Sequence, residues 1–395
     1  MRFGERQAEE HEPVTATPNR LAGDLENILL RTESLWQDLR GERILITGAT
    51  GFFGCWLLES FAWANRRLDL HAHAVGLARH PATLGQKAPH LAADSAVTLH
   101  AADVRHGDFP QGHFSHVIHA ATEANAQLNR EAPALMFDTI VEGTRRALEF
   151  SIASSTARFL LISSGAVYGT QPPQLTHLPE SFSGGPDPLV PASAYAEGKR
   201  AAELLCSLAA TPGLETTVAR CFAFVGPYMR LHAHFAIGNF IGDRLRGGPI
   251  QVHGDGSPFR SYLYASDLAV WLWTILFRGR CRRAYNVGSE DAVNIAAVAN
   301  QVAFAAPSQK VDVRIALSPA AGVPVHRYVP LTARARSELL LHAEVPLQEA
   351  IRRTYLWFAE HQSSGQVTVA PRGTNAEPCY FQIPAASRLP CLRRR

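Results

Sequence analysis

Tyr195 and Lys199 lie four residues apart, a spacing that suits proton transfer. The stretch Tyr195-Ala-Glu-Gly-Lys199 stands near the start of a predicted helix, so the phenol and the ammonium share one helical face. A phenol ionises near pH 10, and work near neutrality needs its pKa lowered by roughly three units, worth about 4 kcal/mol. A lysine cation in a desolvated cleft has the sign to supply this. Tyrosine and lysine pairs on the surface of helices can have the same spacing. The elements that precede this pair therefore decide whether it is catalytic.

Ser164 precedes this pair and follows the apolar run of residues 159–163, which predicts a buried strand. A hydroxyl at that place could hydrogen-bond the same substrate oxygen as Tyr195 and hold it for proton transfer. We therefore predict a catalytic set of Ser164, Tyr195 and Lys199.

The elements that must position these residues begin with a strand and a glycine-rich turn. An apolar run at residues 43–47 leads directly to Gly48, Gly51 and Gly54, and an apolar helical pattern follows. Gly48 permits a tight turn, Gly51 lets backbone amides approach a pyrophosphate, and Gly54 allows the helix to pack on the strand. The anion then lies at the helix N-terminus. A purely structural turn is the alternative, but the flanking pattern favours nucleotide binding.

Strand and helix patterns alternate through the rest of the N-terminal half. Repeated βα units with continuous apolar strands predict an α/β fold, a doubly wound parallel sheet of the Rossmann type with helices on both faces. Strands are predicted at residues 43–47, 70–77, 97–100, 116–121, 158–164 and 216–222, and helices at 21–39, 134–151 and 194–208. The helix at 21–39 is expected beside the first strand.

After Gly226 the pattern becomes mixed, and we assign these residues to a second lobe. Helices are predicted at 235–245, 267–277 and 347–360, and short strands at 250–253, 285–288 and 311–315. Four parts are expected: an N-terminal extension and helix (1–40), a Rossmann dinucleotide-binding domain (41–225), a substrate-binding lobe mixed with late Rossmann elements (226–362), and a flexible tail (363–395).

Composition is that of an ordinary globular protein. The chain has 395 residues, 46% of them hydrophobic, enough for one large domain with a smaller lobe or for two domains. Lys and Arg total 38 against 35 acidic residues, which gives no reason to expect a nucleic-acid partner. The six cysteines show no Cys-x-x-Cys spacing, and no apolar run reaches spanning length. We expect a cytoplasmic protein with reduced thiols and no membrane span.

Five motifs spread over residues 40–360 fit one pattern. They are Thr47-Gly-Ala-Thr-Gly-Phe-Phe-Gly54, His119-Ala-Ala121, Ser163-Ser-Gly-Ala-Val-Tyr-Gly169, Tyr195-x-x-x-Lys199 and Arg260-Ser-Tyr-Leu-Tyr264. Together they resemble the extended short-chain dehydrogenase/reductases and, more narrowly, the nucleotide-sugar epimerase/dehydratase family. The resemblance implies an enzyme that binds NAD or NADP over the sheet and grips a nucleotide-diphosphate sugar with the second lobe. It is much less specific for the reaction than for the superfamily.

The resemblance also implies which residues contact the ligands. The cofactor-binding residues would be Gly48, Thr50, Gly51, Phe52, Phe53, Gly54, Arg79, Asp103, Val104, Ala120, Ala121, Tyr195 and Lys199. Ser164, Arg260 and Arg327 would contact the substrate, because guanidinium forks bind pyrophosphate oxygens bidentately. The apolar stripe at 134–150 resembles helices that pair across a homodimer in related enzymes, although a helix covering its own sheet has the same pattern.

Departures from the family pattern narrow the range of reactions that fit this chain. Dehydratases and decarboxylases of the family carry carboxylates just after the serine or threonine, where this chain has Gly165 and Ala166, and neither can transfer a proton. Epimerisation through a 4-keto sugar, or reduction of a 4-keto sugar, therefore fits best. The alternatives are a 4,6-dehydratase or decarboxylase with non-standard acid/base residues, for which Glu123 or His119 could serve, and a non-catalytic NAD(P)-binding scaffold. Ala223 and Ile140 also replace asparagines that are common in the family.

Two ligand questions remain open at this point. The second strand ends in Arg79, which could meet the 2′-phosphate of NADP or stack on adenine, whereas the resemblance favours NAD. The pairs His71 with His73 and His232 with His234 have no third ligand at recognisable spacing, so we expect no metal.

Overall fold

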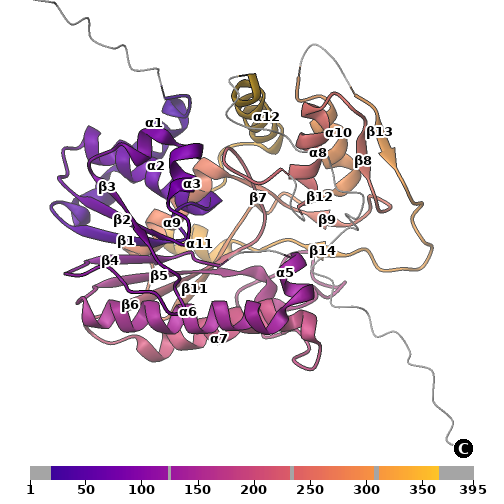
Figure 1. Cartoon of the computed structure of the whole chain (residues 1–395). Helices are drawn as coiled ribbons and strands as arrows, with labels where there is room; N and C mark the ends of the chain where they lie inside the picture. The colour runs from indigo at the N-terminus through magenta and orange to yellow at the C-terminus, as the bar shows by residue number, and fades with distance from the viewer. Residues whose placement is uncertain (1–18, 123–125, 232–234, 307–310, 364–395) are drawn as a thin grey trace, which may run out of the picture.

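The computed structural model describes residues 19–122, 126–231, 235–306 and 311–363 (Figure 1). Its centre is a seven-stranded parallel sheet in the order β11-β6-β5-β4-β1-β2-β3. The strands are β1 (Arg43–Thr47), β2 (His73–Ala78), β3 (Val97–Ala101), β4 (His116–His119), β5 (Arg158–Ser164), β6 (Glu215–Cys221) and β11 (Arg283–Val287). Most are apolar along their whole length because the sheet is covered on both faces. The predicted doubly wound fold is confirmed.

Helices form a layer on each side of this sheet (Figure 1). One layer contains α6 (Pro133–Ala153) and α7 (Ala194–Ala209), which pack against each other and against β4 and β5. The other contains α2 (Phe52–Arg67) and α9 (Ala265–Arg278). Shorter helices join the strands: α3 (Ala82–Lys87), α4 (Pro89–Ala92), α5 (Ala126–Glu131), and the 3-10 turns η2 (Gly165–Tyr168) and η3 (Pro191–Ser193). The catalytic helix predicted at 194–208 is thus α7.

A second lobe lies beside the sheet and is built from short strands and three helices (Figure 1). Its helices are α8 (Ala236–Leu245), α10 (Ile295–Ala303) and α12 (Leu347–Ser363). The strand sets are β12 (Val293–Asn294) with β9 (Phe259–Arg260) and β14 (Arg327–Tyr328); β8 (Ile250–Val252) with β13 (Val313–Ile315); and β7 (Phe224–Val225) with β10 (Leu263–Tyr264). This lobe carries both arginines expected to bind the nucleotide.

Two predicted second-lobe segments belong to the main sheet. Strand β11 pairs with β6 at the sheet edge, and α9 packs on β5, β6 and β11. Helix α11 (Ala333–Leu339) then covers β11. The run at 283–287 is too short for its pattern to reveal which sheet it joins. Residues 226–362 therefore supply both the lobe and the last elements of the nucleotide-binding domain.

The N-terminal segment packs on helices instead of lying beside the first strand as expected. It forms α1 (Ala22–Thr32) and η1 (Glu33–Leu39), and α1 contacts α2 and α9. The Trp36 ring of η1 lies 4.6 Å from the Trp273 ring of α9, measured between centroids. Helix α9 is apolar around most of its surface and is buried between the sheet and this segment. The extension thus completes the core on that side.

Within the described ranges, no helix combines the length and the apolarity needed to cross a membrane. Four cysteines fall in these ranges and all are free thiols; Cys55, Cys206 and Cys221 are buried and Cys281 is exposed.

Truncation of Trp36 tests whether the N-terminal segment is part of the core. Trp36→Ala should lower the free energy of unfolding by about 3–5 kcal/mol, because a fully buried indole leaves a cavity against Trp273. Denaturant unfolding followed by circular dichroism measures the loss. Leu30→Ala, on the exposed side of α1, serves as the control and should change stability by less than about 0.5 kcal/mol. Equal stability of the two variants would show that the segment is a peripheral addition.

Candidate functional site

The glycine turn after β1 is shaped by close contacts that a side chain would break. Gly48 has φ +72°, and a methyl group added there would lie 2.7 Å from the Ala120 carbonyl oxygen. A methyl group at Gly54 would lie 2.5 Å from the Ala49 backbone, so this glycine lets α2 start against the turn. Gly51 precedes the first residue of α2. The turn therefore forms a cradle at the N-terminus of a 16-residue helix, which fits a dinucleotide pyrophosphate.

Thr47 ties the end of β4 to this cradle. Its hydroxyl oxygen accepts the backbone N–H groups of Ala120 and Ala121, both at 3.1 Å, and lies 2.9 Å from Nδ1 of His119. With both lone pairs taken, the Thr47 hydroxyl donates to His119. Burial lowers the pKa of His119 to about 3, so its imidazole is neutral. His119 is thus a buried neutral group tied to Thr47, while Glu123, the other substitute acid considered above, lies outside the described residues.

Tyr195 is fixed at the start of α7 and meets Ser164 at the end of β5. The Tyr195 N–H donates to Oδ1 of Asn129 at 3.1 Å, and Nδ2 of Asn129 donates to the Ala192 carbonyl at 2.8 Å. The Ser164 side chain is close enough to Tyr195 to oppose the rise in the pKa of its phenol. The structure therefore brings the predicted phenol and hydroxyl together.

Lys199 lies one turn further along α7 and is held by two acceptors. Its ammonium donates to the Ile162 carbonyl at 2.7 Å and to the Thr122 hydroxyl at 3.1 Å. Both acceptors stand at the carboxyl ends of neighbouring strands or just after them. Sequence reasoning did not find Thr122, because it follows β4 in a turn with no motif of its own.

Burial dominates the ionisation of both groups. It raises the pKa of Tyr195 to about 12, against which the hydrogen bond with Ser164 acts, and it lowers the pKa of Lys199 to about 8. The Lys199 ammonium is directed at Ile162 and Thr122. Without a bound cofactor Tyr195 is neutral near pH 7. A further positive charge beside it is needed to favour the phenolate.

The predicted adenosine contacts lie at the ends of β2 and β3. Asp103 accepts two hydrogen bonds from the Arg105 guanidinium and one from its N–H, and the Arg105 side chain holds the Asp103 pKa at about 2. Val104 is buried against α6, where a methyl group at Gly143 would come within 2.9 Å of it. Arg79 is exposed. Lys87, which sequence reasoning missed, donates to the Thr50 carbonyl at 2.7 Å and adds a cation near the cradle.

The two predicted phosphate-binding arginines come from adjacent strands of the second lobe. Strands β9 and β14 are parallel, with Arg327 opposite Phe259 and Tyr328 opposite Arg260. The Arg327 guanidinium lies 4.2 Å above the centre of the Phe259 ring, and Arg260 donates to the Phe259 carbonyl at 2.7 Å. Both arginines are half-buried, and the register places Arg327 with Phe259 on one face of this small sheet and Arg260 with Tyr328 on the other.

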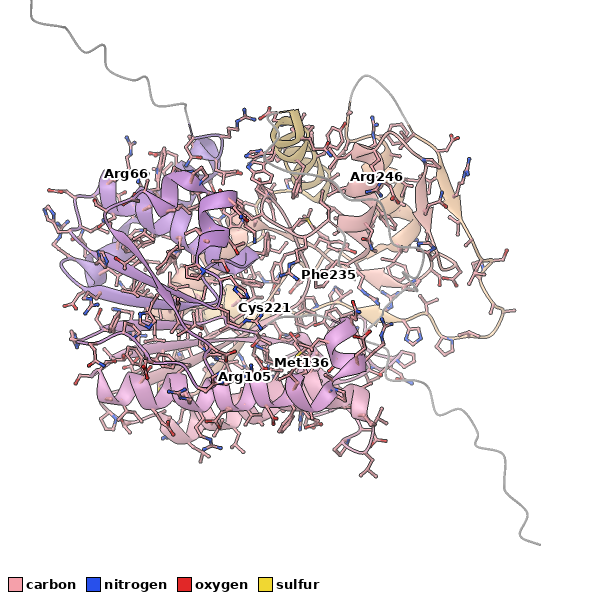
Figure 2. The ribbon with its side chains drawn as sticks, viewed as in Figure 1. Arg66, Arg105, Met136, Cys221, Phe235 and Arg246 are labelled. Atoms are coloured by element: carbon pink, nitrogen blue, oxygen red, sulfur yellow. The ribbon has the colours of Figure 1, made fainter. Side chains whose placement is uncertain are left out.

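The position after Ser164 has no room for a side chain. A methyl group at Gly165 would lie 2.7 Å from both the Phe222 ring and the Tyr328 hydroxyl. A carboxylate at this position would need both aromatic residues to move. Next to it, Cys221 pairs with Ser164 in the register of β5 and β6, and Figure 2 labels it near the centre of the view. Sequence reasoning gave no role to either Tyr328 or Cys221.

Within the part of the chain that the structure describes, no group of three or more His, Cys, Asp and Glu side chains is placed to hold a metal ion. His71 and His73 are among the residues searched, whereas His232 and His234 lie outside the described residues.

A parallel sheet with a glycine cradle after β1, and with a tyrosine and a lysine one turn apart on α7, defines an extended short-chain dehydrogenase/reductase. More narrowly, the chain belongs to the NAD dependent epimerase/dehydratase family, whose model matches residues 44–288. It is an enzyme of that family, and the family's cofactor supports NAD over NADP.

Individual relatives differ in their reactions. UDP-glucuronic acid decarboxylase 1 of Danio rerio is 28% identical over 84% of this chain and 77% of its own length. The dTDP-glucose 4,6-dehydratase of Streptomyces niveus is 26% identical over 69% of this chain and 77% of its own. Among solved structures, the dTDP-glucose 4,6-dehydratase of Streptomyces venezuelae has a TM-score of 0.67 at 22% identity, covering 82% of this chain and 98% of that one. A UDP-glucose 4-epimerase of Thermotoga maritima has a TM-score of 0.64 at 19% identity, and the match covers 81% of this chain and 99% of that one. The two structures support the fold alone.

Two glycines with the same backbone angle provide a matched test of the cradle. Gly48 and Gly247 both have φ +72°, but a methyl group at Gly247 would meet nothing within 4 Å. Both alanine variants incur the left-handed backbone penalty of about 1–2 kcal/mol. Only Gly48→Ala should also weaken NAD binding, by about tenfold or more, because Ala120 must move away from the cradle. Calorimetric titration with NAD measures this, and equal affinity in both variants would contradict the assignment.

Proposed function

We propose that this enzyme transfers a hydride at C4 of a nucleotide-linked hexose. It either uses NAD to oxidise C4 and then returns the hydride to the opposite face, which is an epimerisation, or it uses NADH to reduce a 4-keto sugar. The observation that carries the proposal is the meeting of Ser164 and Tyr195 at the end of β5, with Gly165 in place of a family carboxylate. NAD, when bound, accepts and returns a hydride. The protein must then supply only positioning and one exchangeable proton, which these residues can do.

Each residue of the catalytic set has a separate role in the proposal. Tyr195 exchanges the proton of the sugar hydroxyl or carbonyl oxygen, and Ser164 orients that oxygen. Lys199, held by Ile162 and Thr122, supplies a positive charge at the ribose side of the cofactor site. Oxidised nicotinamide carries the additional positive charge that favours the phenolate of Tyr195.

Arg260 and Arg327 are proposed to hold the pyrophosphate of the sugar nucleotide. The preference of guanidinium for phosphate oxygens supports this role, and both arginines belong to the second lobe. The reacting sugar would then lie between this pair and Ser164.

Decarboxylation of a nucleotide-linked uronic acid is the second candidate, favoured by the names of the relatives that match most of the chain. Once C4 is a ketone, a carboxylate on C5 is in the β-keto position, so carbon dioxide can leave with its electrons accepted by the carbonyl. This step needs no base to remove a proton from carbon, unlike 4,6-dehydration. The missing carboxylate after Ser164 therefore argues less strongly against decarboxylation than against dehydration.

A panel of nucleotide sugars separates these reactions. The purified enzyme would be incubated with UDP-glucose, dTDP-glucose, UDP-glucuronic acid and a 4-keto sugar nucleotide, while products and NADH absorbance are followed. Formation of an isomer without a net change in NADH indicates an epimerase. Stoichiometric oxidation of NADH indicates a reductase, and release of carbon dioxide indicates a decarboxylase. NAD binding with no conversion of any sugar would favour a non-catalytic scaffold.

Tyr195→Phe should lower turnover by about 10²–10⁴-fold while leaving NAD affinity nearly unchanged, because only the exchangeable proton is removed. Tyr355→Phe on α12 removes an equivalent hydroxyl away from the site and should keep full turnover. Turnover is measured with the sugar nucleotide that the panel identifies. Wild-type turnover in Tyr195→Phe would refute the role of the phenol.

We also propose a homodimer formed through α6 and α7. The outer face of these helices exposes Leu135, Ile152, Leu204 and Leu208, with exposed fractions of 40–71%. Exposed apolar residues on two adjacent helices favour association with a second copy. A cytoplasmic location is proposed from the widely spaced free thiols, and cell fractionation would test it.

Leu204→Arg with Leu208→Arg should convert the dimer to a monomer, because the charges would be buried at the contact. Sedimentation measures the mass. Leu317→Arg, at a 62% exposed leucine in the second lobe, is the control and should leave the mass unchanged. A wild-type protein that sediments as a monomer would rule the dimer out.

A further inference from the structure

Thr122 lies in the turn that follows β4 and contacts the lysine of the catalytic set. Its hydroxyl oxygen accepts a hydrogen bond from the Lys199 ammonium at 3.1 Å, and the Ile162 carbonyl accepts a second at 2.7 Å. Lys199 is 3% exposed, so these two acceptors replace water around a buried charge. An ammonium has three N–H groups, and within the described ranges the third has no acceptor. The third N–H is therefore available to a ligand.

The turn that carries Thr122 is fixed by the residue that precedes the glycine cradle. The Thr47 hydroxyl accepts the N–H groups of Ala120 and Ala121, and the N–H of Thr122 donates to the Ala120 carbonyl at 2.8 Å. The same carbonyl lies 2.7 Å from where a side chain at Gly48 would begin. Three successive backbone N–H groups of the turn are thus satisfied. The Thr122 hydroxyl is consequently positioned by the same contacts that shape the cradle.

Other titratable groups approach Lys199 from three elements. Glu203 and Cys206 face it from α7 and Cys221 faces it from β6, and burial keeps both thiols neutral by raising their pKa. Glu203 is already engaged in an ion pair with β6. His119 of β4 is neutral, because burial lowers its pKa to about 3. Within the part of the chain that the structure describes, two neutral acceptors and no carboxylate hydrogen-bond the ammonium.

We propose that Thr122 is a positioning residue whose hydroxyl keeps Lys199 charged and directs its remaining N–H toward the nicotinamide ribose. Loss of this hydroxyl would leave the Ile162 carbonyl as the remaining acceptor and so favour the neutral amine. A neutral amine donates a weaker hydrogen bond to a ribose hydroxyl than an ammonium does. The inference deepens the proposed function and rests on it for the place of Lys199 beside the ribose.

Binding of NADH to the full-length protein, followed by nucleotide fluorescence as the pH is varied, tests this role. Burial lowers the pKa of Lys199 to about 8, so wild-type affinity should fall as the pH rises through about 8. Thr122→Val should move this fall to lower pH by about one unit, the effect of losing one hydrogen bond to a charged group. The variant should then bind NADH nearly as well as wild type at about pH 6 and about fivefold more weakly at about pH 8.

Three further variants are the controls. Thr122→Ser restores the acceptor and should follow the wild-type curve. Thr211→Val removes an exposed hydroxyl ahead of β6, at the opposite end of the strands, and should leave the curve in place. Lys199→Met should abolish the pH-dependent fall, which assigns the fall to this amine. Thermal unfolding shows whether each variant is folded, and Thr122→Ala gives the same comparison if the valine variant is not.

A purely structural role for Thr122 would weaken NADH binding equally at every pH. That result, or a wild-type midpoint in folded Thr122→Val, would overturn the proposal, as would a fall that persists in Lys199→Met. The titration uses no sugar. A shifted midpoint in a protein that converts no nucleotide sugar would therefore refute the proposed reaction and leave the role of Thr122 standing.

Discussion

Removal of an ammonium and a phenol from water at the end of β5 is the constraint on which this site depends. Helix α7 packs closely on α6 at Gly198, where an added methyl group would lie 3.2 Å from Ile140. This contact buries Tyr195 and Lys199, and desolvation disfavours the charged form of both. The hydrogen bonds that Lys199 donates to Ile162 and Thr122, and the Ser164 hydroxyl near Tyr195, offset only part of that cost. The site is therefore tuned for a ligand that brings its own positive charge.

A partly buried ion pair joins the catalytic helix to the strand beside β5. Glu203, one turn after Lys199, accepts the Ser163 hydroxyl at 2.6 Å and pairs with Arg220 of β6 at 2.7 Å. Arg220 donates to the Tyr168 hydroxyl at 3.0 Å, which donates to Asn286 of β11 at 2.7 Å. The network joins α7, β5, β6 and β11, and removing one charged partner would leave the other buried and unpaired.

The sequence predicted the local elements well because their signals are local. The 43–47 strand, the 158–164 strand and the α7 helix follow from continuous apolar runs and helical spacing. It could not place Tyr328 beside Ser164, since that contact joins residues 164 positions apart through a two-residue strand. Likewise, the short apolar pattern around Tyr285 did not indicate that its strand joins the main sheet. Spacing puts Lys199 near Tyr195, but the acceptors at Ile162 and Thr122 decide where its ammonium points, and neither acceptor belongs to a sequence motif.

The chain leaves the sheet after β6, returns with α9 and β11, and leaves it again to build β14 and α12. The second lobe is consequently discontinuous in sequence. A fragment beginning at Gly226 would take α9 and β11 away from the nucleotide-binding domain and expose their apolar faces, while a fragment ending there would lose one edge of the sheet. A cut at this boundary therefore does not separate the sheet from the lobe, and the lobe cannot be exchanged as one contiguous segment of the chain.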